Sequence, residues 1–473
     1  MPGTTLVGGV WDDPADRRTV TAPADGSVVG SVGYGDAALA GSAADAAAAA
    51  ASEWAETPPA VRAATLVRAA TALADRADEI GRPLAAETGK RLPEAVGEVG
   101  FAAAYLRWFG EQARRPSGEV LEPDQPGRRQ ITFRRPAGVV ASLTPWNFPV
   151  SIQARKLAPA LAAGCTVVAR ASEKAPLAVV ELVRCLQEAG LPDGVLNLVH
   201  GPASKLTDAL LDHPAVRVVS FTGSTEVGRR VMELSSRRIV RPLLELGGDA
   251  PFIVFDDADL DAAVDGAMLA KFRNNGQSCM AANRFYVHSA VYDEFAGRFA
   301  AKVDAMTVGD GLADPTPDLG PLIDNSRVEA VRDLVAEAVD AGAKPLTAAK
   351  PVPDGGSYAA PVLLGDVPEG VGLSCQEVFG PVAGVFRFDT EAEVIARANA
   401  TEMGLAAYFF TRDASRVWRV GEALEAGIVG VNTGLPSAPH APMGGVKQSG
   451  LGREGADLGL EEFQEVRYLC QNL

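Results

Sequence analysis

The order of hydrophobic and polar residues predicts helices and strands along most of the chain. Ala-, Leu-, Arg- and Glu-rich segments at 37–57 and 59–88 predict long helices that are separated at Pro58. From residue 137, short apolar segments such as AGVVASL, CTVVA and VRVVSF each precede a helix-like segment. A second series of this kind starts at PFIVF, residues 251–255, and continues to about residue 430. Apolar strands separated by helices predict an α/β fold with parallel sheets covered by helices on both faces.

Two further segments alternate between apolar and polar residues. Ile131 and Phe133 alternate with polar neighbours within 127–136, which is typical of a half-exposed strand. The tail EEFQEVRYLCQNL, residues 461–473, alternates in a similar way. The first segment lies far from other alternating segments in the sequence, so we expect it to be an arm, with the tail as its second strand.

The composition is that of a globular protein. Of 473 residues, 47% are apolar and 22% are charged, and this length suits about three domains, or two domains with insertions. The 44 Lys and Arg residues against 60 Asp and Glu residues give a net charge of −16, which repels phosphate backbones and anionic lipid. No signal-peptide pattern or membrane-spanning apolar run is visible. We therefore expect no nucleic-acid partner and no membrane association.

Five cysteines are spread along the chain, at Cys165, Cys185, Cys279, Cys375 and Cys470, and they form no CxxC pair. Neither a disulfide framework nor a metal site is expected, and a cytoplasmic location is favoured. Cys279, in NNGQSC, lies between a helix-like and a strand-like segment, where loops often carry nucleophiles. The ordinary alternative for such a cysteine is a small buried hydrophobic residue.

Other polar positions fall where an α/β sheet would place a site. Glu245, in LLELGG, is flanked by leucines, so a raised pKa could suit it to act as a general base, or it is a salt-bridged residue at a strand end. Asn147 follows an apolar strand and is either an oxyanion donor or a turn residue. In FTGSTEVG, Gly223, Ser224 and Gly228 suit a pyrophosphate neighbour, or simply a helix cap.

Together these segments resemble the aldehyde dehydrogenase superfamily over essentially the whole chain. LELGGDAP matches the family's glutamate motif and GQSC matches its cysteine motif. TPWNFP, FTGSTEVG, EVFGPV and GGVKQSGLGRE occur in the family order. The resemblance implies two Rossmann-type domains and a small oligomerisation arm. It places the NAD(P)-binding domain at 1–117 and 137–246, the catalytic domain at 247–441, and the arm and tail at 118–136 and 442–473.

The resemblance also implies roles for individual residues. Cys279 is the expected nucleophile, and Glu245 the expected activator of the hydrolytic water. The Asn147 amide and the Cys279 backbone N–H form the expected oxyanion site, and Lys156 resembles the family's relay lysine. The residues implied on the cofactor side are Trp146, Arg170, Ser172, Glu173, Gly223, Ser224, Gly228, Glu377 and Phe379.

Glu173 resembles the residue that binds the 2′-hydroxyl of the adenosine ribose. A 2′-phosphate would meet the charge of that carboxylate, so NAD is the expected cofactor. NADP is the alternative, because Arg170 and Lys174 offset the repulsion.

Within the superfamily, the closest likeness is to the succinate-semialdehyde dehydrogenases. Arg155, Arg273 and Ser437 match residues that hold the substrate carboxylate there, and Phe148 is expected to line the same site. Met443 stands where a phenylalanine is common, which favours a softer or wider pocket. A glutarate-type or phosphono-aldehyde would also suit two arginines.

Two other function classes are open to this fold. A CoA-acylating dehydrogenase has no need for a water-activating base, so Glu245 argues against it. A non-catalytic structural protein is disfavoured by the intact Cys279, Glu245 and Asn147. An exposed edge strand is hazardous unless it is paired, so the arm implies a homodimer or homotetramer.

Overall fold

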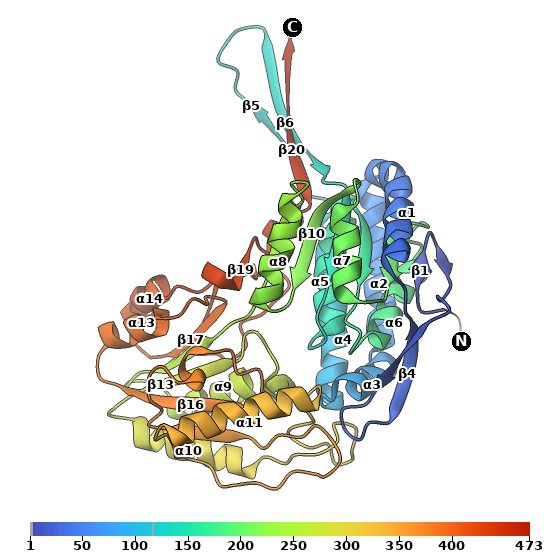
Figure 1. Ribbon diagram of the computed structural model, residues 1–473. Helices are drawn as coiled ribbons and strands as arrows, with labels where there is room; N and C mark the ends of the chain where they lie inside the picture. Colours follow the sequence, from blue (N-terminus) through green and yellow to red (C-terminus); the bar gives the residue numbers. More distant parts are fainter. Residues whose placement is uncertain (1–2, 116–117) are drawn as a thin grey trace.

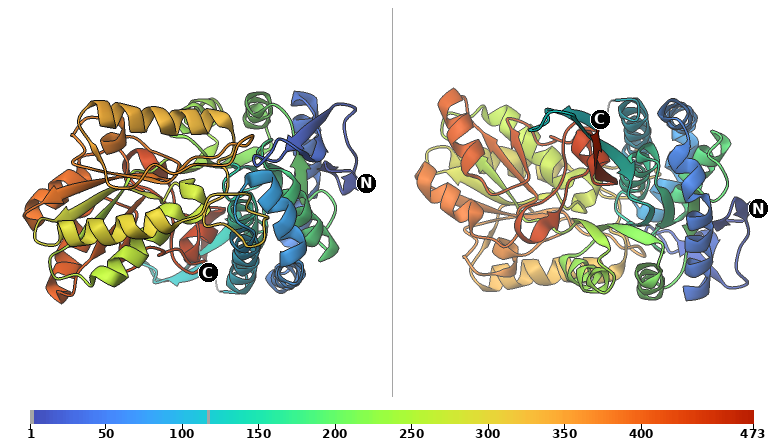
Figure 2. Two further views of the ribbon diagram at one scale, coloured as in Figure 1. Left: turned by 90° about the horizontal axis from the view of Figure 1, so that it is seen from below. Right: turned by 90° about the horizontal axis from the view of Figure 1, so that it is seen from above.

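The computed structural model describes residues 3–115 and 118–473 as two sheet-centred lobes and a long β-arm (Figure 1). Figure 2 gives two further views of the lobes, which lie side by side, one drawn mainly in blue and green and the other in yellow and orange. The sheet at the centre of each lobe consists mostly of parallel strands. The predicted α/β fold class is therefore confirmed.

The first lobe opens with short strands and a set of helices. One predicted helix, 37–57, is present, whereas the 59–88 segment is two helices that meet at Arg76. The Arg76 guanidinium contacts Glu79 at 2.8 Å and Glu181 at 2.6 Å, so the break is tied to a neighbouring helix. The elements are β1 (Leu6–Val7), β2 (Val10–Trp11), β3 (Arg17–Thr21), β4 (Val28–Gly33), α1 (Ala37–Glu56), α2 (Pro59–Asp75), α3 (Ala77–Thr88) and α4 (Leu92–Gln112).

The first large sheet has the strand order β19-β11-β10-β7-β8-β9-β1-β2. Its central strands and their helices are β7 (Val139–Leu143), α5 (Pro149–Ala163), β8 (Thr166–Arg170), α6 (Leu177–Glu188), β9 (Leu196–Val199), α7 (Ala203–Asp212), β10 (Val216–Thr222), α8 (Thr225–Ser236) and β11 (Arg241–Glu245). Strand β7 is buried throughout, with Val140 packed in one hydrophobic cluster and Val139 and Ala141 in another. Burial on both faces explains why these strands are continuous apolar runs.

The second large sheet has the order β14-β15-β16-β13-β12-β17-β18. Its hydrophobic clusters again lie on two faces, one with α9 and α10 and one with α11. The elements are β12 (Ala250–Val254), α9 (Leu260–Phe272), β13 (Ala282–His288), α10 (Tyr292–Ala305), α11 (Asn325–Asp340), β14 (Lys344–Pro345), β15 (Val362–Gly365), α12 (Gly372–Cys375), β16 (Val382–Phe388), α13 (Glu391–Asn399), β17 (Ala406–Phe410), α14 (Ala414–Ala423) and β18 (Ile428–Val431).

The arm is a three-stranded sheet that projects away from both lobes (Figure 1). Strand β6 (Arg128–Pro136) pairs antiparallel with β20 (Gln464–Asn472) over its whole length, and with β5 (Gly118–Leu121) on its other edge. The predicted pairing of the two alternating segments is therefore present. Large apolar side chains remain exposed on this arm, namely Val120, Val466, Tyr468, Leu469 and Leu473.

The 442–473 segment serves more than the arm. Strand β19 (Gly450–Leu451) joins the first large sheet beside β11, and α15 (Ala456–Glu461) packs against α5 before β20 enters the arm. The chain between these elements therefore returns to the region between the two lobes. Across the described residues, no helix combines the length and the apolar character that crossing a membrane requires.

Candidate active site

The nucleophile candidate Cys279 lies in the loop between α9 and β13. A 3-10 turn, Arg273–Gly276, precedes it, in which Asn274 and Asn275 have φ values of 54° and 59°. Asparagine tolerates this left-handed backbone better than most residues. The side chain of Asn275 fixes the turn, because its amide donates to the carbonyl of Pro321 at 2.9 Å and its oxygen accepts from the N–H of Gly320 at 2.8 Å.

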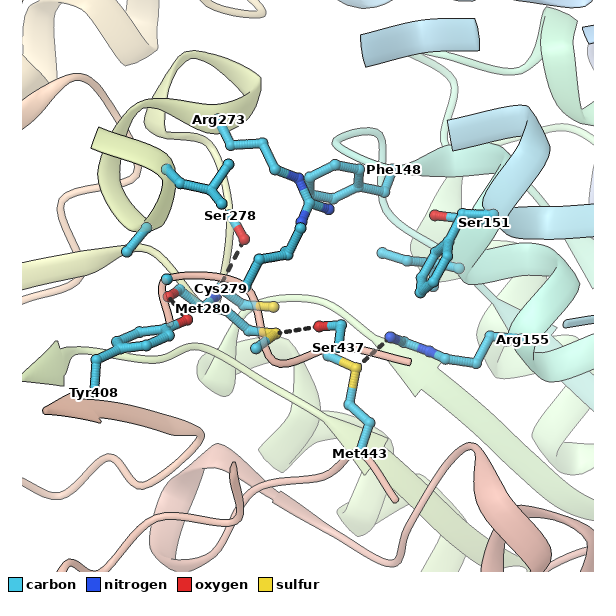
Figure 3. A pocket seen from close by; sticks show the side chains of 16 residues that line it. Phe148, Ser151, Arg155, Arg273, Ser278, Cys279, Met280, Tyr408, Ser437 and Met443 are labelled. Carbon is cyan, nitrogen blue, oxygen red and sulfur yellow. Dashed lines mark hydrogen bonds between the residues drawn. The ribbon is translucent and has the colours of Figure 1, made fainter. Parts of the chain in front are cut away.

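Cys279 opens into a pocket between α5, α9 and the loop around residues 434–443 (Figure 3). All four predicted substrate residues line this pocket with it, namely Arg155, Arg273, Phe148 and Ser437. Other labelled lining residues are Ser151, Ser278, Met280, Tyr408 and Met443. The structure thus brings the predicted nucleophile and the predicted substrate residues into one cavity.

The surroundings of Cys279 disfavour its thiolate form. Burial raises the pKa of the Cys279 thiol, and the negative charges of Glu245 and Glu377 raise it further, whereas Arg155 acts in the opposite direction. Because the thiolate is the reactive form, a base must take the proton before or during attack.

Glu245 is the carboxylate best placed for such work. It ends β11, is 1% exposed, and its Oε1 atom has no hydrogen-bond partner among the described residues. Burial raises the pKa of Glu245 to about 7, although Arg155, 3.3 Å from its Oε2 atom, opposes the shift. A carboxyl group with such a pKa exchanges protons near neutral pH, as a general base requires.

The two glycines after Glu245 allow the nucleophile loop to come close. A Cβ on Gly248 would stand 2.2 Å from the carbonyl oxygen of Cys279. A Cβ on Gly247 would stand 3.0 Å from a carboxylate oxygen of Glu377, and the N–H of Gly248 donates to the other oxygen of Glu377 at 3.1 Å. The LELGG segment is therefore shaped by close contact with the nucleophile loop and with Glu377.

Asn147 is connected to the same loop. Its side-chain amide donates to the carbonyl of Gln277 at 3.1 Å, and its own carbonyl accepts from the Asn274 amide at 3.0 Å. An amide nitrogen carries two hydrogens, so one N–H of Asn147 remains for an oxygen that forms beside Cys279. Asn147 lies in a bend, as the turn alternative expects, and it is also buried and bonded to the nucleophile loop.

Lys156 is buried beside a glutamate that sequence reasoning did not assign. Its ammonium donates to the Ser220 hydroxyl at 3.0 Å and pairs with Glu454, which also pairs with Arg155. Burial lowers the pKa of Lys156, and Glu454 opposes that shift. Although burial alone would raise it, the charges of Lys156 and Arg155 lower the pKa of Glu454.

An antiparallel bridge between Met443 and Glu454 brings Glu454 to this position. The N–H of each residue donates to the carbonyl of the other, at 2.7 and 2.6 Å. The only sequence signal for Glu454 was its place in the GGVKQSGLGRE motif, which gives no indication of its partners. Met443 itself lines the pocket, and its sulfur contacts the Arg155 guanidinium.

The two substrate arginines occupy different surroundings. Arg155, on α5, is 5% exposed and is engaged by Glu245 and Glu454. Arg273, at the end of α9, lies over the Phe148 ring at 4.9 Å from its centroid, with no ion pair among the described residues. The Ser437 hydroxyl lies 3.3 Å from the sulfur of Met280 at the same pocket. Arg273 is thus a cation without a charged partner at the pocket.

The adenosine-side candidates gather at the carboxyl end of β8. A carboxylate oxygen of Glu173 accepts from the Tyr34 hydroxyl at 2.8 Å, and Ser172 accepts from the N–H of Lys174 at 3.3 Å. The Nε atom of Arg170 is buried with no hydrogen-bond partner among the described residues. A carboxylate next to an unsatisfied guanidinium N–H suits the hydroxyl groups of a ribose, so these residues fit a dinucleotide.

The FTGSTEVG residues have structural tasks of their own. Ser224 caps α8 by accepting from the N–H of Val227 at 3.4 Å, as the helix-cap alternative expects. A Cβ on Gly228 would stand 2.4 Å from the Leu246 side chain, and one on Gly223 would stand 2.4 Å from the Phe221 ring. These contacts explain the two glycines by packing.

A second group of cofactor candidates lies nearer to Cys279. The rings of Trp146 and Phe379 meet edge to face with centroids 5.5 Å apart, and Phe379 has a φ of 48°. Burial raises the pKa of Glu377 to about 7, although the N–H of Gly248 lowers it. The aromatic pair and the carboxylate therefore lie beside the Gly247–Gly248 turn that contacts the nucleophile loop.

Comparison with known proteins agrees with this geometry. The model of the aldehyde dehydrogenase family matches residues 11–469. The chain belongs to the aldehyde dehydrogenase family. It is 46% identical to a glutarate-semialdehyde dehydrogenase of Pseudomonas aeruginosa over 466 residues, covering 98% of this chain and 96% of the relative. It is also 46% identical to an NADP(+) succinate-semialdehyde dehydrogenase of Escherichia coli over 470 residues, covering 99% and 97%.

The fold of this aldehyde dehydrogenase is shared with solved structures. A crystal structure of succinate-semialdehyde dehydrogenase from Burkholderia pseudomallei superposes with a TM-score of 0.97 at 43% identity, covering 100% of this chain and 98% of that one. The family resemblance, and with it the fold of two Rossmann-like domains, is confirmed.

Proposed function

We propose that this aldehyde dehydrogenase oxidises a small aldehyde that carries an anionic group, with succinate semialdehyde as the first candidate. The observation that carries the proposal is the position of Arg273, a cation without a charged partner among the described residues, in the same pocket as Cys279. The names of the relatives from Escherichia coli and Pseudomonas aeruginosa support a semialdehyde of four or five carbons. Glutarate semialdehyde is therefore the second candidate.

The chemistry begins at Cys279. Glu245 takes the thiol proton, since its pKa of about 7 leaves much of it as the carboxylate at neutral pH. The Cys279 sulfur then attacks the aldehyde carbon, and the resulting alkoxide accepts hydrogen bonds from the Asn147 amide and the Cys279 N–H. Loss of hydride from this thiohemiacetal leaves a thioester on Cys279. After Glu245 has released the thiol proton to solvent, it deprotonates the water that releases the carboxylic acid.

A nicotinamide cofactor supplies one step of this chemistry by accepting the hydride when it is bound. Glu377, Phe379 and Trp146 are the proposed residues on its nicotinamide side, and Arg170, Ser172 and Glu173 on its adenosine side. Gly223, Ser224 and Gly228 lie at the start of α8, where backbone N–H groups suit a pyrophosphate. Lys156 and Glu454 form a buried proton-carrying pair behind the site.

The preferred cofactor is NAD. Tyr34 donates to one oxygen of Glu173 and so directs the carboxylate, whose charge opposes a 2′-phosphate. The Escherichia coli relative is named for NADP(+), so membership of the family does not decide between NAD and NADP. We assign the choice between the two cofactors to Glu173 instead. In Glu173→Ser, the affinity for 2′-phospho-AMP relative to AMP should rise about tenfold or more, measured by calorimetry, since one repulsive charge is removed. A variant with an unchanged ratio would overturn the NAD assignment.

The assembly we propose is a homodimer or homotetramer that pairs through the arm. The exposed Val120 and Leu469 both lie opposite Ile131, on one face of the three-stranded sheet, which a second copy would cover. All five cysteines are free thiols, which supports a reducing cytoplasm as the place of action. Sedimentation of an active monomer would rule out the assembly.

The function is tested by a substrate panel followed by absorbance at 340 nm. Succinate semialdehyde, glutarate semialdehyde and butanal are each offered with NAD or NADP, with and without coenzyme A. Both acid aldehydes should exceed butanal in kcat/KM, and coenzyme A should not be required because Glu245 activates water. A preference for butanal would contradict the anionic substrate, and an absolute need for coenzyme A would contradict hydrolysis.

A further inference from the structure

Two buried charged residues outside the roles assigned above, Lys90 and Glu98, hold the segment that carries Asn147. Lys90 follows α3 and is 0% exposed, and Glu98 lies on α4 and is 5% exposed. Their side chains form an ion pair with each other. Burying two charges is costly, and such a pair is retained where its directional contacts matter.

Lys90 holds Asn147 and its neighbour from one side. Its ammonium donates to the backbone carbonyl of Asn147 at 2.7 Å and lies 4.5 Å from the centroid of the Phe148 ring. Hydrogen bonds from a charged donor are shorter and stronger than neutral ones. The peptide that follows the Asn147 side chain is therefore fixed by a charged contact.

Glu98 holds the next turn of the same segment. One of its carboxylate oxygens accepts from the N–H of Val150 at 2.9 Å and from the N–H of Ser151 at 3.2 Å. Helix α5 begins here, and its own N-cap residue, Phe148, makes no side-chain capping bond. Glu98 thus caps α5 from another helix, where a carboxylate also suits the positive end of the helix dipole.

The held segment is connected directly to the nucleophile loop. The carbonyl that Lys90 contacts also accepts from the Asn274 amide, at 3.0 Å, and this amide reaches the carbonyl of Gln277 at 3.0 Å. The Asn147 amide donates to that same Gln277 carbonyl at 3.1 Å. A shift of the Asn147 peptide would therefore change the distance between its amide and the loop that carries Cys279.

We propose that the Lys90–Glu98 ion pair is a positioning device that fixes the Asn147 amide against the Cys279 loop. The proposal rests on the proposed function, in which Asn147 donates to the oxyanion. Donors to an oxyanion act only when their geometry is set before the reaction, and a displacement of about 1 Å costs on the order of a hundredfold in rate. Neither residue lines the part of the pocket that holds Cys279, although Glu98 borders its outer mouth. In this role both act through Asn147.

The chain offers a matched control in Glu87. Its carboxylate is also fully buried and also caps a helix, because it accepts from the N–H groups of Leu177 at 2.8 Å and Ala178 at 3.0 Å at the start of α6. Within the described residues, its hydrogen bonds reach neither Asn147 nor the nucleophile loop. Glu87 is close enough to Lys90 and Glu98 to feel their charges, but its hydrogen bonds go to α6. Glu87→Gln thus changes a buried capping group without removing a hydrogen bond to the segment that carries Asn147.

The test compares Lys90→Met, Glu98→Gln and Glu87→Gln in rapid mixing of the full-length enzyme. The first two variants should slow the formation of NADH in the first turnover by about ten- to a hundredfold. The rate at which iodoacetamide alkylates Cys279 and the KM for aldehyde should stay near their wild-type values. Glu87→Gln should lower the melting temperature and leave the first-turnover rate unchanged. A wild-type rate in Glu98→Gln, or an equal rate loss in all three variants, would overturn the proposal.

A double-mutant cycle separates positioning from general damage. In an Asn147→Ala background, Lys90→Met should add almost no further loss, because its effect passes through the missing amide. Losses that multiply would assign Lys90 a structural role and overturn the proposal. If Asn147→Ala itself leaves the first turnover unchanged, the oxyanion role in the proposed function fails instead.

A neutral pair covers the case in which Lys90→Met does not fold. Lys90→Met/Glu98→Gln removes both charges together, so it should recover folding stability. It lacks the charged donor to the Asn147 carbonyl, so its first-turnover rate should stay about ten- to a hundredfold low. Recovery of the wild-type rate along with stability would mean that the ion pair serves charge balance alone.

Discussion

The two arginines of the pocket use their charge in different ways. Arg155 is buried and lies between Glu245 and Glu454, so its charge is compensated within the protein. Arg273 lies across the pocket over the Phe148 ring, with no ion pair among the described residues. A compensated charge sets the pKa of a neighbouring carboxyl group, whereas an uncompensated one at a pocket can hold a ligand carboxylate. We therefore expect Arg155 to serve the chemistry and Arg273 to serve the choice of substrate.

The largest loss of activity should come from replacing Cys279, which shares its pocket with both arginines. Cys279→Ala removes the nucleophile, so oxidation of acid and neutral aldehydes alike should be abolished while cofactor binding persists. Steady-state rates and fluorescence titration with NADH check this prediction. The other four cysteines line no part of the Cys279 pocket. Appreciable turnover in the variant would move the nucleophile elsewhere.

Glu245→Gln should give the next largest loss of activity, and it should leave the preference between acid and neutral aldehydes unchanged. Hydrolysis of the thioester loses its base, so steady-state turnover should fall by about 10²–10³-fold for both kinds of aldehyde. Because Glu245 also takes the Cys279 proton in the proposed mechanism, rapid mixing should show no burst of NADH in the first turnover. A burst of about one NADH per active site would limit Glu245 to hydrolysis of the thioester and assign the thiol proton to another base.

Arg155→Met sharpens the comparison because it removes the compensated charge. Glu245 would lose the cation that opposes its raised pKa, so less of it would be ionised at neutral pH. Acid and neutral aldehydes should both lose about ten- to a hundredfold in kcat/KM, and the melting temperature should fall since a buried pair is broken. A loss confined to succinate semialdehyde would instead make Arg155 a carboxylate-binding residue like Arg273.

The pH dependence of turnover follows from Glu245, which is paired with Arg155. Burial raises the pKa of Glu245 from its ordinary value of 4.5 to about 7, and the ionised form is the base. Turnover with saturating substrate should therefore fall as the pH drops below about 7, with a slope of one, and Glu245→Gln should remove this limb. The pKa of Glu377 is also raised to about 7, so Glu377→Gln is the control and should keep the limb.

Sequence reasoning reached the elements whose pattern is local. The alternation around Ile131 and Phe133 predicted the arm, and the motif order predicted the family and the residues gathered around Cys279. It did not reach contacts between distant segments, such as the Lys156–Glu454 pair, whose members are 298 residues apart. It also passed over Lys90, just after α3, and Glu98, on α4, because a charged residue in or beside a helix gives no sign in the sequence that it is buried. The helix break at Arg76 was also missed, because its partner Glu181 lies on another helix that is distant in the sequence.

The most direct test of the account is the ratio of kcat/KM for succinate semialdehyde to that for butanal, in the wild type and in Arg273→Ala. Arg91, at the outer mouth of the pocket, is the matched control because its charge already pairs with Glu94 at 3.1 Å. A charged hydrogen bond is worth roughly 1.5–3 kcal/mol, so Arg273→Ala should lower the ratio by about ten- to a hundredfold, whereas Arg91→Ala should change it little. Equal losses for the two aldehydes in Arg273→Ala would contradict the claim that this arginine selects the anionic substrate.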